Sequence, residues 1–122
     1  MGAIMAGRLT THVLDTARGI PAAGMALALY ALDGDARVQL ATGRTNANGR
    51  TDAPLLQGAA LRVGRYELVF QIGEYFRAAG VALANPAFLD EVPLRFAIAD
   101  AAAHYHVPLL CSPWSYSTYR GS

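Results

Sequence analysis

The chain has 122 residues, of which 53% are hydrophobic and 16% are charged, and its formal net charge is +1. This length fits one domain, and the composition is too apolar for a disordered chain, so we expect a packed core. All ten basic residues are arginines scattered along the sequence without a basic run, which argues against a nucleic-acid partner.

Segments rich in apolar and β-branched residues alternate with turn signals about every ten residues, a pattern typical of a β-sandwich or barrel. In the first expected strand, residues 9–15, Leu9, Thr11 and Val13 share one face and His12 lies on the other. Further strands are expected at residues 25–32, 37–45, 66–72, 92–98, 105–112 and 115–119.

Turn and helix signals punctuate these strands. The run from Asn46 to Gly49 predicts a hairpin turn after the third strand, because Asn and Gly tolerate a positive φ. Residues 74–79 have a helical composition and stop before Gly80, so we predict one short helix there. A helix of two turns must dock on a sheet. The expected fold class is therefore all-β, a sandwich with one short helix.

The chain ends and the single cysteine set the expected environment. Residues 1–7 are too short for the apolar region of a signal peptide, and we expect them to be extended or disordered before a domain at 8–122. No apolar stretch is long enough to cross a membrane, so we expect a cytoplasmic protein without a membrane partner. Cys111 lies in an apolar run, which favours a buried side chain over a nucleophile.

Three histidines are the strongest candidates for chemistry. His104 and His106 are two residues apart, so on a strand they point to the same face. His12 joins them only if the terminal strands of the fold are neighbours. For any one histidine a structural role is the commoner explanation. Three imidazoles can also hold a zinc ion with one position open for water, so a zinc hydrolase is an alternative.

Arg50 and the C-terminal tail are weaker candidates on the residues alone. Arg50 follows the Asn48-Gly49 turn, from which its fork of donors can reach a carbonyl or carboxylate, although turn arginines are usually solvated. The last seven residues include two tyrosines, three hydroxyl side chains and an arginine. This composition is unusual for a chain end and indicates a tail that packs against a specific target.

Several segments in this order resemble the 5-hydroxyisourate hydrolases of the transthyretin-like family. They cover nearly the whole chain from Arg8: LTTHVLD at 9–15, TNANGR at 45–50, FLDEVPLRF at 88–96, HYHVPLL at 104–110 and the tail YRGS at 119–122. The resemblance implies a sandwich of two four-stranded sheets, assembled as a homotetramer (a dimer of dimers) with active sites at the dimer–dimer interface. It also implies an enzyme that needs neither a metal nor another cofactor.

The same resemblance implies roles for particular residues. His12, Arg50 and His106 would contact the substrate or catalyse, and Tyr119 and Ser122 of the tail would join them, Tyr119 in substrate binding and Ser122 in catalysis. The expected reaction is hydrolysis of a ring amide of 5-hydroxyisourate in urate breakdown. Either histidine qualifies as the general base. A small-ligand binding protein without catalysis is the alternative, because the fold alone does not decide between them.

Overall fold

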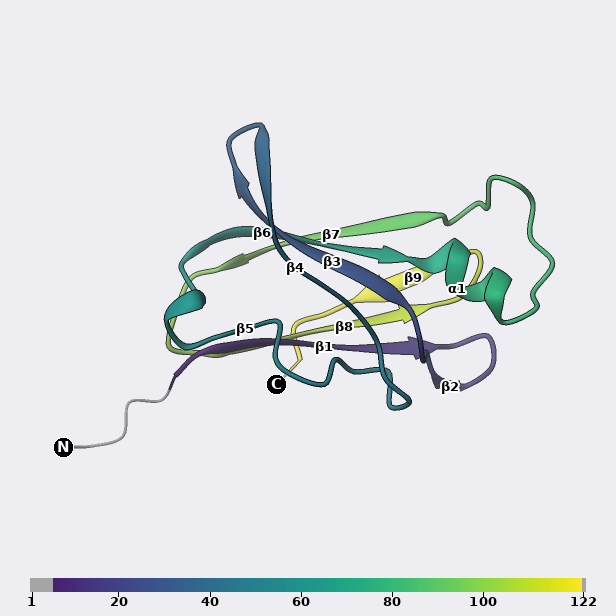
Figure 1. Ribbon diagram of the computed structural model, residues 1–122, viewed down its shortest axis with the longest axis horizontal. Helices are drawn as coiled ribbons and strands as arrows, with labels where there is room; N and C mark the ends of the chain where they lie inside the picture. Colours follow the sequence, from purple (N-terminus) through teal and green to yellow (C-terminus); the bar gives the residue numbers. More distant parts are fainter. Residues whose placement is uncertain (1–5, 122) are drawn as a thin grey trace.

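The computed structural model describes residues 6–121, and it shows two facing β-sheets with one short helix at one end of the sandwich (Figure 1). The all-β sandwich with one helix that the sequence predicted is therefore confirmed. Within residues 6–121, no helix has the length and apolarity that a membrane crossing requires. Residues 1–7 were expected to be extended or disordered, but residues 1–5 lie outside the described residues, as does Ser122.

The first sheet has the strand order β2-β1-β8-β9, and β5 adds to it by pairing with β1. Its strands are β1 (Arg8–Asp15), β2 (Ile20–Pro21), β5 (Leu56–Gln57), β8 (His104–Cys111) and β9 (Tyr116–Thr118). The sheet thus has five strands where four were expected. Neither β2 nor β5 has a clear signal in the sequence, because each spans only two residues.

The second sheet has the order β4-β3-β6-β7, and each pair in it is antiparallel. Its strands are β3 (Ala26–Asp33), β4 (Ala36–Arg44), β6 (Gly64–Gln71) and β7 (Glu91–Ile98). A single turn of 3-10 helix, η1 (Gly58–Ala60), precedes β6. These strands lie within two residues of the positions that the sequence predicted.

The pairing of β1 with β8 is parallel and joins the two ends of the chain. Arg8 lies opposite His104, and the register continues to Asp15 opposite Cys111. Along both strands the side chains alternate between the sandwich interior and the outer face of the sheet. Leu9, Thr11 and Val13 are buried, as their alternation predicted.

The core fills the space between the sheets with aliphatic and aromatic side chains. Its largest fully buried members are Leu9, Met25, Leu29, Leu68, Phe70, Ile72, Phe76, Ile98 and Leu109. Helix α1 (Ile72–Ala78) closes one end, and it begins two residues before the predicted start because Ile72 packs into the core. The helix ends at Ala78, and Gly80, two residues later, has a φ of +88°, the left-handed stop that the sequence predicted.

The turn after β4 differs from the predicted hairpin. Gly49 has the expected positive φ of +75°, but the chain does not return along β4. It crosses to the first sheet, where Gly49 accepts a hydrogen bond from the backbone N–H of Val13 (2.8 Å). A Cβ on Gly49 would lie 2.4 Å from the carbonyl oxygen of Val13, so only glycine permits this approach. The turn therefore links the two sheets.

A buried carboxylate anchors the loop between β1 and β2. Asp15 has a fully buried side chain, which accepts hydrogen bonds from Nε of Arg18 (2.8 Å) and the hydroxyl of Tyr75 (2.9 Å). Burial alone would raise the pKa of Asp15, but these hydrogen bonds and the Arg18 charge outweigh it and lower the pKa below its usual value. The network ties this loop to helix α1.

Candidate active site

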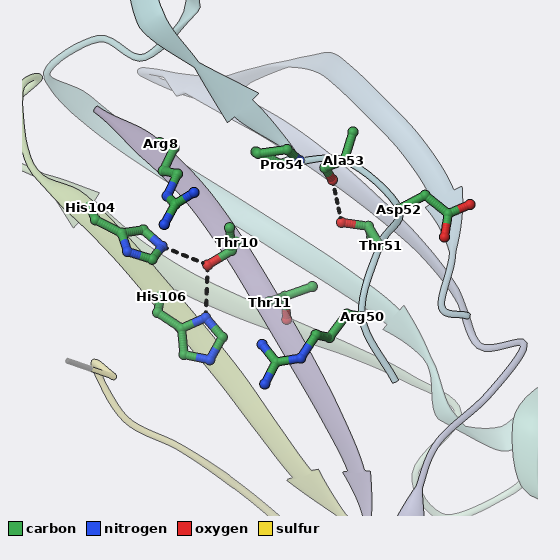
Figure 2. Close-up of a pocket in the computed structure, with 10 residues that line it drawn as sticks. All are labelled: Arg8, Thr10, Thr11, Arg50, Thr51, Asp52, Ala53, Pro54, His104 and His106. Atoms are coloured by element: carbon green, nitrogen blue, oxygen red, sulfur yellow. Dashed lines mark hydrogen bonds between the residues drawn. The ribbon is translucent and has the colours of Figure 1, made fainter. Parts of the chain in front are cut away.

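A hollow of about 440 Å³ opens on the outer face of the first sheet, beside the segment that follows the inter-sheet turn (Figure 2). Its lining is mostly polar and carries two guanidinium groups and two imidazoles. The residues that line it are Arg8, Thr10, Thr11, Arg50, Thr51, Asp52, Ala53, Pro54, His104 and His106.

Strand alternation and the parallel register together place both imidazoles of β8 in this hollow. His104 and His106 point to the outer face of the sheet, and their ring centroids are 6.2 Å apart. Thr10 lies opposite His106 on β1. The hydroxyl of Thr10 is 2.9 Å from Nε2 of His104 and 2.8 Å from Nδ1 of His106. One hydroxyl therefore links the two rings.

Arg50 reaches the hollow because the inter-sheet turn holds its backbone. The side-chain oxygen of Asn46 accepts hydrogen bonds from the backbone N–H groups of Asn48 (2.9 Å) and Arg50 (3.2 Å). Arg50 then pairs with His12 in an isolated antiparallel bridge. Within residues 6–121 the Arg50 guanidinium forms neither an ion pair nor a hydrogen bond, and Figure 2 shows it pointing toward His106. Its donors face the hollow, where a ligand can use them.

His12 lies on the same face of β1 as Thr10, and its backbone bridge to Arg50 keeps it beside the hollow. It does not line the hollow itself in the single chain. Its charge nevertheless acts on His106, together with those of Arg50 and His104. The structure thus brings His12, Arg50 and His106 into one neighbourhood, although more than ninety residues separate the two histidines in sequence.

The C-terminal tail also approaches His106. After β9, the guanidinium of Arg120 lies over the ring of Tyr105 at 4.2 Å, and the backbone N–H of Gly121 donates to the carbonyl of His106 (2.8 Å). Tyr119 is 61% exposed and lines a separate hollow between β7 and β9, so a single chain does not bring it to His106. Ser122, the remaining candidate, lies outside the described residues.

Burial and nearby cations favour neutral imidazoles in the hollow. The pKa of His106 is lowered below 6.5, first by burial and then by the charges of Arg50, His104 and His12. Burial and the charge of Arg8 lower the pKa of His104 in the same direction. Near neutral pH, both rings are therefore available as proton acceptors. Two guanidiniums beside them favour a ligand that carries negative charge or polarised carbonyl oxygens.

A bound metal ion or a nucleophilic cysteine would each be another basis for a hydrolytic site. In the described part of the chain, no group of three or more His, Cys, Asp or Glu side chains is arranged to hold a metal ion. Burial raises the pKa of the Cys111 thiol to about 12, with a smaller contribution from the charge of Asp15. The expectation that Cys111 is a buried, unreactive side chain agrees with this environment.

Residues 9–121 match the sequence profile of the HIUase/Transthyretin family. The chain belongs to this family. It is 65% identical to 5-hydroxyisourate hydrolase 2 of Rhizobium meliloti over 116 residues, which span 95% of this chain and 97% of that protein. The resemblance inferred from the sequence motifs is therefore confirmed.

Solved structures of the HIUase/Transthyretin family include both an enzyme and a binding protein. The 5-hydroxyisourate hydrolase of Klebsiella pneumoniae is 36% identical, with a TM-score of 0.78, and the match covers 95% of this chain and 99% of that one. Sea bream transthyretin in complex with thyroxine is 28% identical, with a TM-score of 0.83 over 93% of this chain and 94% of that one. The fold alone therefore does not separate the two classes.

Sequence reasoning missed three residues of this neighbourhood. Thr10 could have been found, because it precedes His12 by two residues and so shares its strand face. Arg8 could have been found in the same way, because it precedes Thr10 by two residues and shares its strand face. The contact of Gly121 with His106 could not have been found, because it depends on where the tail runs after β9.

Proposed function

We propose that this chain hydrolyses a ring amide of 5-hydroxyisourate, with His12, Arg50 and His106 as its active residues. The observation that carries the proposal is that His106 and an unpaired Arg50 line one hollow, and that His12 lies beside it through its backbone bridge to Arg50. The chain that carries this arrangement is 65% identical to a named hydrolase. The substrate is a small ring with several carbonyl groups, which suits a hollow lined by guanidinium donors. The reaction belongs to the cyclic amide hydrolases.

The proposed mechanism uses the neutral imidazole of His106 as the general base. It removes a proton from water as the oxygen adds to the ring carbonyl, and positioned bases of this kind contribute about 10²–10⁴-fold. Arg50 donates to the oxyanion of the tetrahedral intermediate, a contribution of about 3–4 kcal/mol in comparable sites. The C–N bond then breaks, and the departing nitrogen takes a proton from the His12 or His106 imidazolium. The product is the carboxylate 2-oxo-4-hydroxy-4-carboxy-5-ureidoimidazoline.

We further propose that four copies assemble as a dimer of dimers and complete the site. In one chain the hollow is open to solvent, because Arg8, Arg50 and His104 are exposed. Large apolar side chains also remain exposed at Ile20, Trp114 and Tyr119. Burial of such side chains between copies would exclude water from the hollow and give Tyr119 and Ser122 a place near substrate. A cytoplasmic location is part of the same proposal, and cell fractionation would test it.

The decisive experiment generates 5-hydroxyisourate from urate with urate oxidase and follows its decay by absorbance. The chain should accelerate the decay well beyond the spontaneous rate, whereas His106→Asn and Arg50→Gln should lose at least about 10²-fold in kcat/KM. Arg62→Gln, on an exposed loop outside the hollow, is the matched control and should retain full activity. Full activity in both site variants would overturn the residue assignment. If the unaltered chain does not accelerate the decay, a ligand-binding protein without catalysis is the remaining alternative. Titration with thyroxine would test it.

Full activity after metal stripping is also expected, and activity that requires added zinc would favour the metal-dependent alternative. Sedimentation of the purified protein would test the tetramer.

A further inference from the structure

The hydroxyl of Thr10 lies between the two imidazoles of β8, close enough to bond to both. Its oxygen is 2.9 Å from Nε2 of His104 and 2.8 Å from Nδ1 of His106. Figure 2 shows a dashed line from the Thr10 oxygen to each of the two rings. The distances alone do not fix which atom donates in each bond, because each neutral ring carries its proton on either nitrogen.

A threonine hydroxyl has a single proton to donate, and this limits the possible arrangements. If Thr10 donates to His104, then Nδ1 of His106 must carry a proton and donate to Thr10. In that case Nε2 of His106 has a free lone pair. If Thr10 donates to His106 instead, Nε2 of His106 carries the proton and cannot act as a base. The direction of this short chain of hydrogen bonds therefore decides whether His106 is ready to accept a proton at Nε2.

The surroundings of His106 favour the first arrangement. Arg50 lies close enough for its charge to act on the ring, and Figure 2 shows its guanidinium on the side of the ring away from Thr10. Arginine has only donors, so an N–H at Nε2 would point toward other N–H groups, whereas a lone pair there would not. The groups that act on His106 electrostatically, Arg50, His104 and His12, are all donors or cations when charged.

We propose that Thr10 and His104 are positioning residues that hold His106 in the tautomer with its proton on Nδ1 and its lone pair on Nε2. The expected effect on the reaction rate rests on the proposed function, whereas the tautomer of His106 does not depend on it. His104 accepts the proton of the Thr10 hydroxyl, which leaves Thr10 free to accept from His106. When His106 takes a proton from water at Nε2, the bond from Nδ1 to Thr10 stays unchanged. No hydrogen bond of the chain has to reverse during the reaction.

The test compares two substitutions at Thr10. Thr10→Val keeps the shape of the side chain and removes the hydroxyl, whereas Thr10→Ser keeps the hydroxyl. Neither change alters the charged groups around His106. For Thr10→Val we expect kcat to fall about 10- to 100-fold with KM nearly unchanged, because the base loses its orientation but the substrate contacts remain. Thr10→Ser should stay within a few-fold of the unaltered chain.

A second readout is independent of activity. Long-range 15N–1H correlation spectra of the substrate-free protein, above the pKa of His106, report which ring nitrogen is protonated. We expect His106 to carry its proton on Nδ1 in the unaltered chain and in Thr10→Ser, and to shift toward Nε2 in Thr10→Val. His104→Phe should shift it likewise, because the Thr10 proton then turns toward His106.

The proposal fails if the unaltered chain has the Nε2–H tautomer, or if Thr10→Val keeps full kcat. It also fails if Thr10→Val and Thr10→Ser lose activity equally, since that pattern indicates a packing role. An unaltered chain with the Nδ1–H tautomer but no hydrolysis would instead refute the proposed function and leave the positioning role of Thr10 intact.

Discussion

A methyl group at Gly121 would disturb the histidine proposed as the general base. A Cβ on Gly121 would lie 2.5 Å from Cδ2 of His106 and 3.1 Å from its Cγ, whereas ordinary contact begins near 3.4 Å. The ring or the tail must therefore move by about 0.9 Å. The ring cannot swing away freely, because its Nδ1 is bonded to Thr10 at 2.8 Å, and the tail is held by the bond from Gly121 N–H to the carbonyl of His106.

A misplacement of about 1 Å at a reacting group can cost about 10²-fold in rate, or about 2.7 kcal/mol of transition-state stabilisation. We expect Gly121→Ala to lose about this much in kcat/KM for 5-hydroxyisourate, measured by the decay of the substrate. The thermal midpoint should change little, because Gly121 is only partly buried. Gly43→Ala is the matched control, since nothing lies within 4 Å of a Cβ there and its φ is ordinary. Unchanged kcat/KM for Gly121→Ala would refute the reasoning.

Three further predictions concern pH, stability and thiol reactivity. The acid limb of the kcat/KM profile should have its midpoint below 6.5, because the lowered pKa keeps His106 neutral and basic to lower pH; a midpoint at or above 6.5 would contradict the assigned environment. Asp15→Asn should lower the free energy of unfolding by about 1–3 kcal/mol near neutral pH in urea titrations, whereas Asp33→Asn, at the exposed end of β3, should change it by less than about 0.5 kcal/mol. Because the folded-state pKa of Asp15 is lowered, its stabilisation is present above the ordinary value of 3.8 and is lost as the pH falls through the lowered pKa, so the difference between Asp15→Asn and the unaltered chain should shrink in acid. Cys111 should not react with a thiol-specific disulfide reagent in the folded protein near pH 8, because burial raises the pKa of its thiol to about 12, and it should react fully in denaturant. Rapid labelling of the folded chain would show that the thiol is accessible.

The strands could be predicted from sequence because their signal is local. Alternation of Leu9, Thr11 and Val13 identifies the buried face of β1 without knowledge of its partner. The same reasoning predicted correctly that His104 and His106 share a face. Gly80 marked the helix end for an equally local reason, its positive φ.

The assembly of the site could not be predicted, because it depends on pairings between distant segments. Nothing in the residues around His12 indicates that β1 lies parallel to β8, and only the family resemblance suggested that the histidines meet. The predicted hairpin at Asn46 failed for the same reason, since a turn sequence fixes backbone angles but not the sheet to which the chain continues. The proposed place of Tyr119 near the substrate would require further copies of the chain, which no pattern within one chain describes.

The parallel contact of β1 with β8 also has a consequence for biosynthesis. The hydrogen bonds from Thr10 to the two imidazoles close loops of 94 and 96 residues, which is most of the polypeptide. Closing such loops costs chain entropy that local contacts do not offset. We therefore expect this pairing to form late in folding. A nascent chain still lacking β8 has His12 and Arg50 but neither of the other two histidines, and one edge of β1 stays open to other strands until β8 has been made.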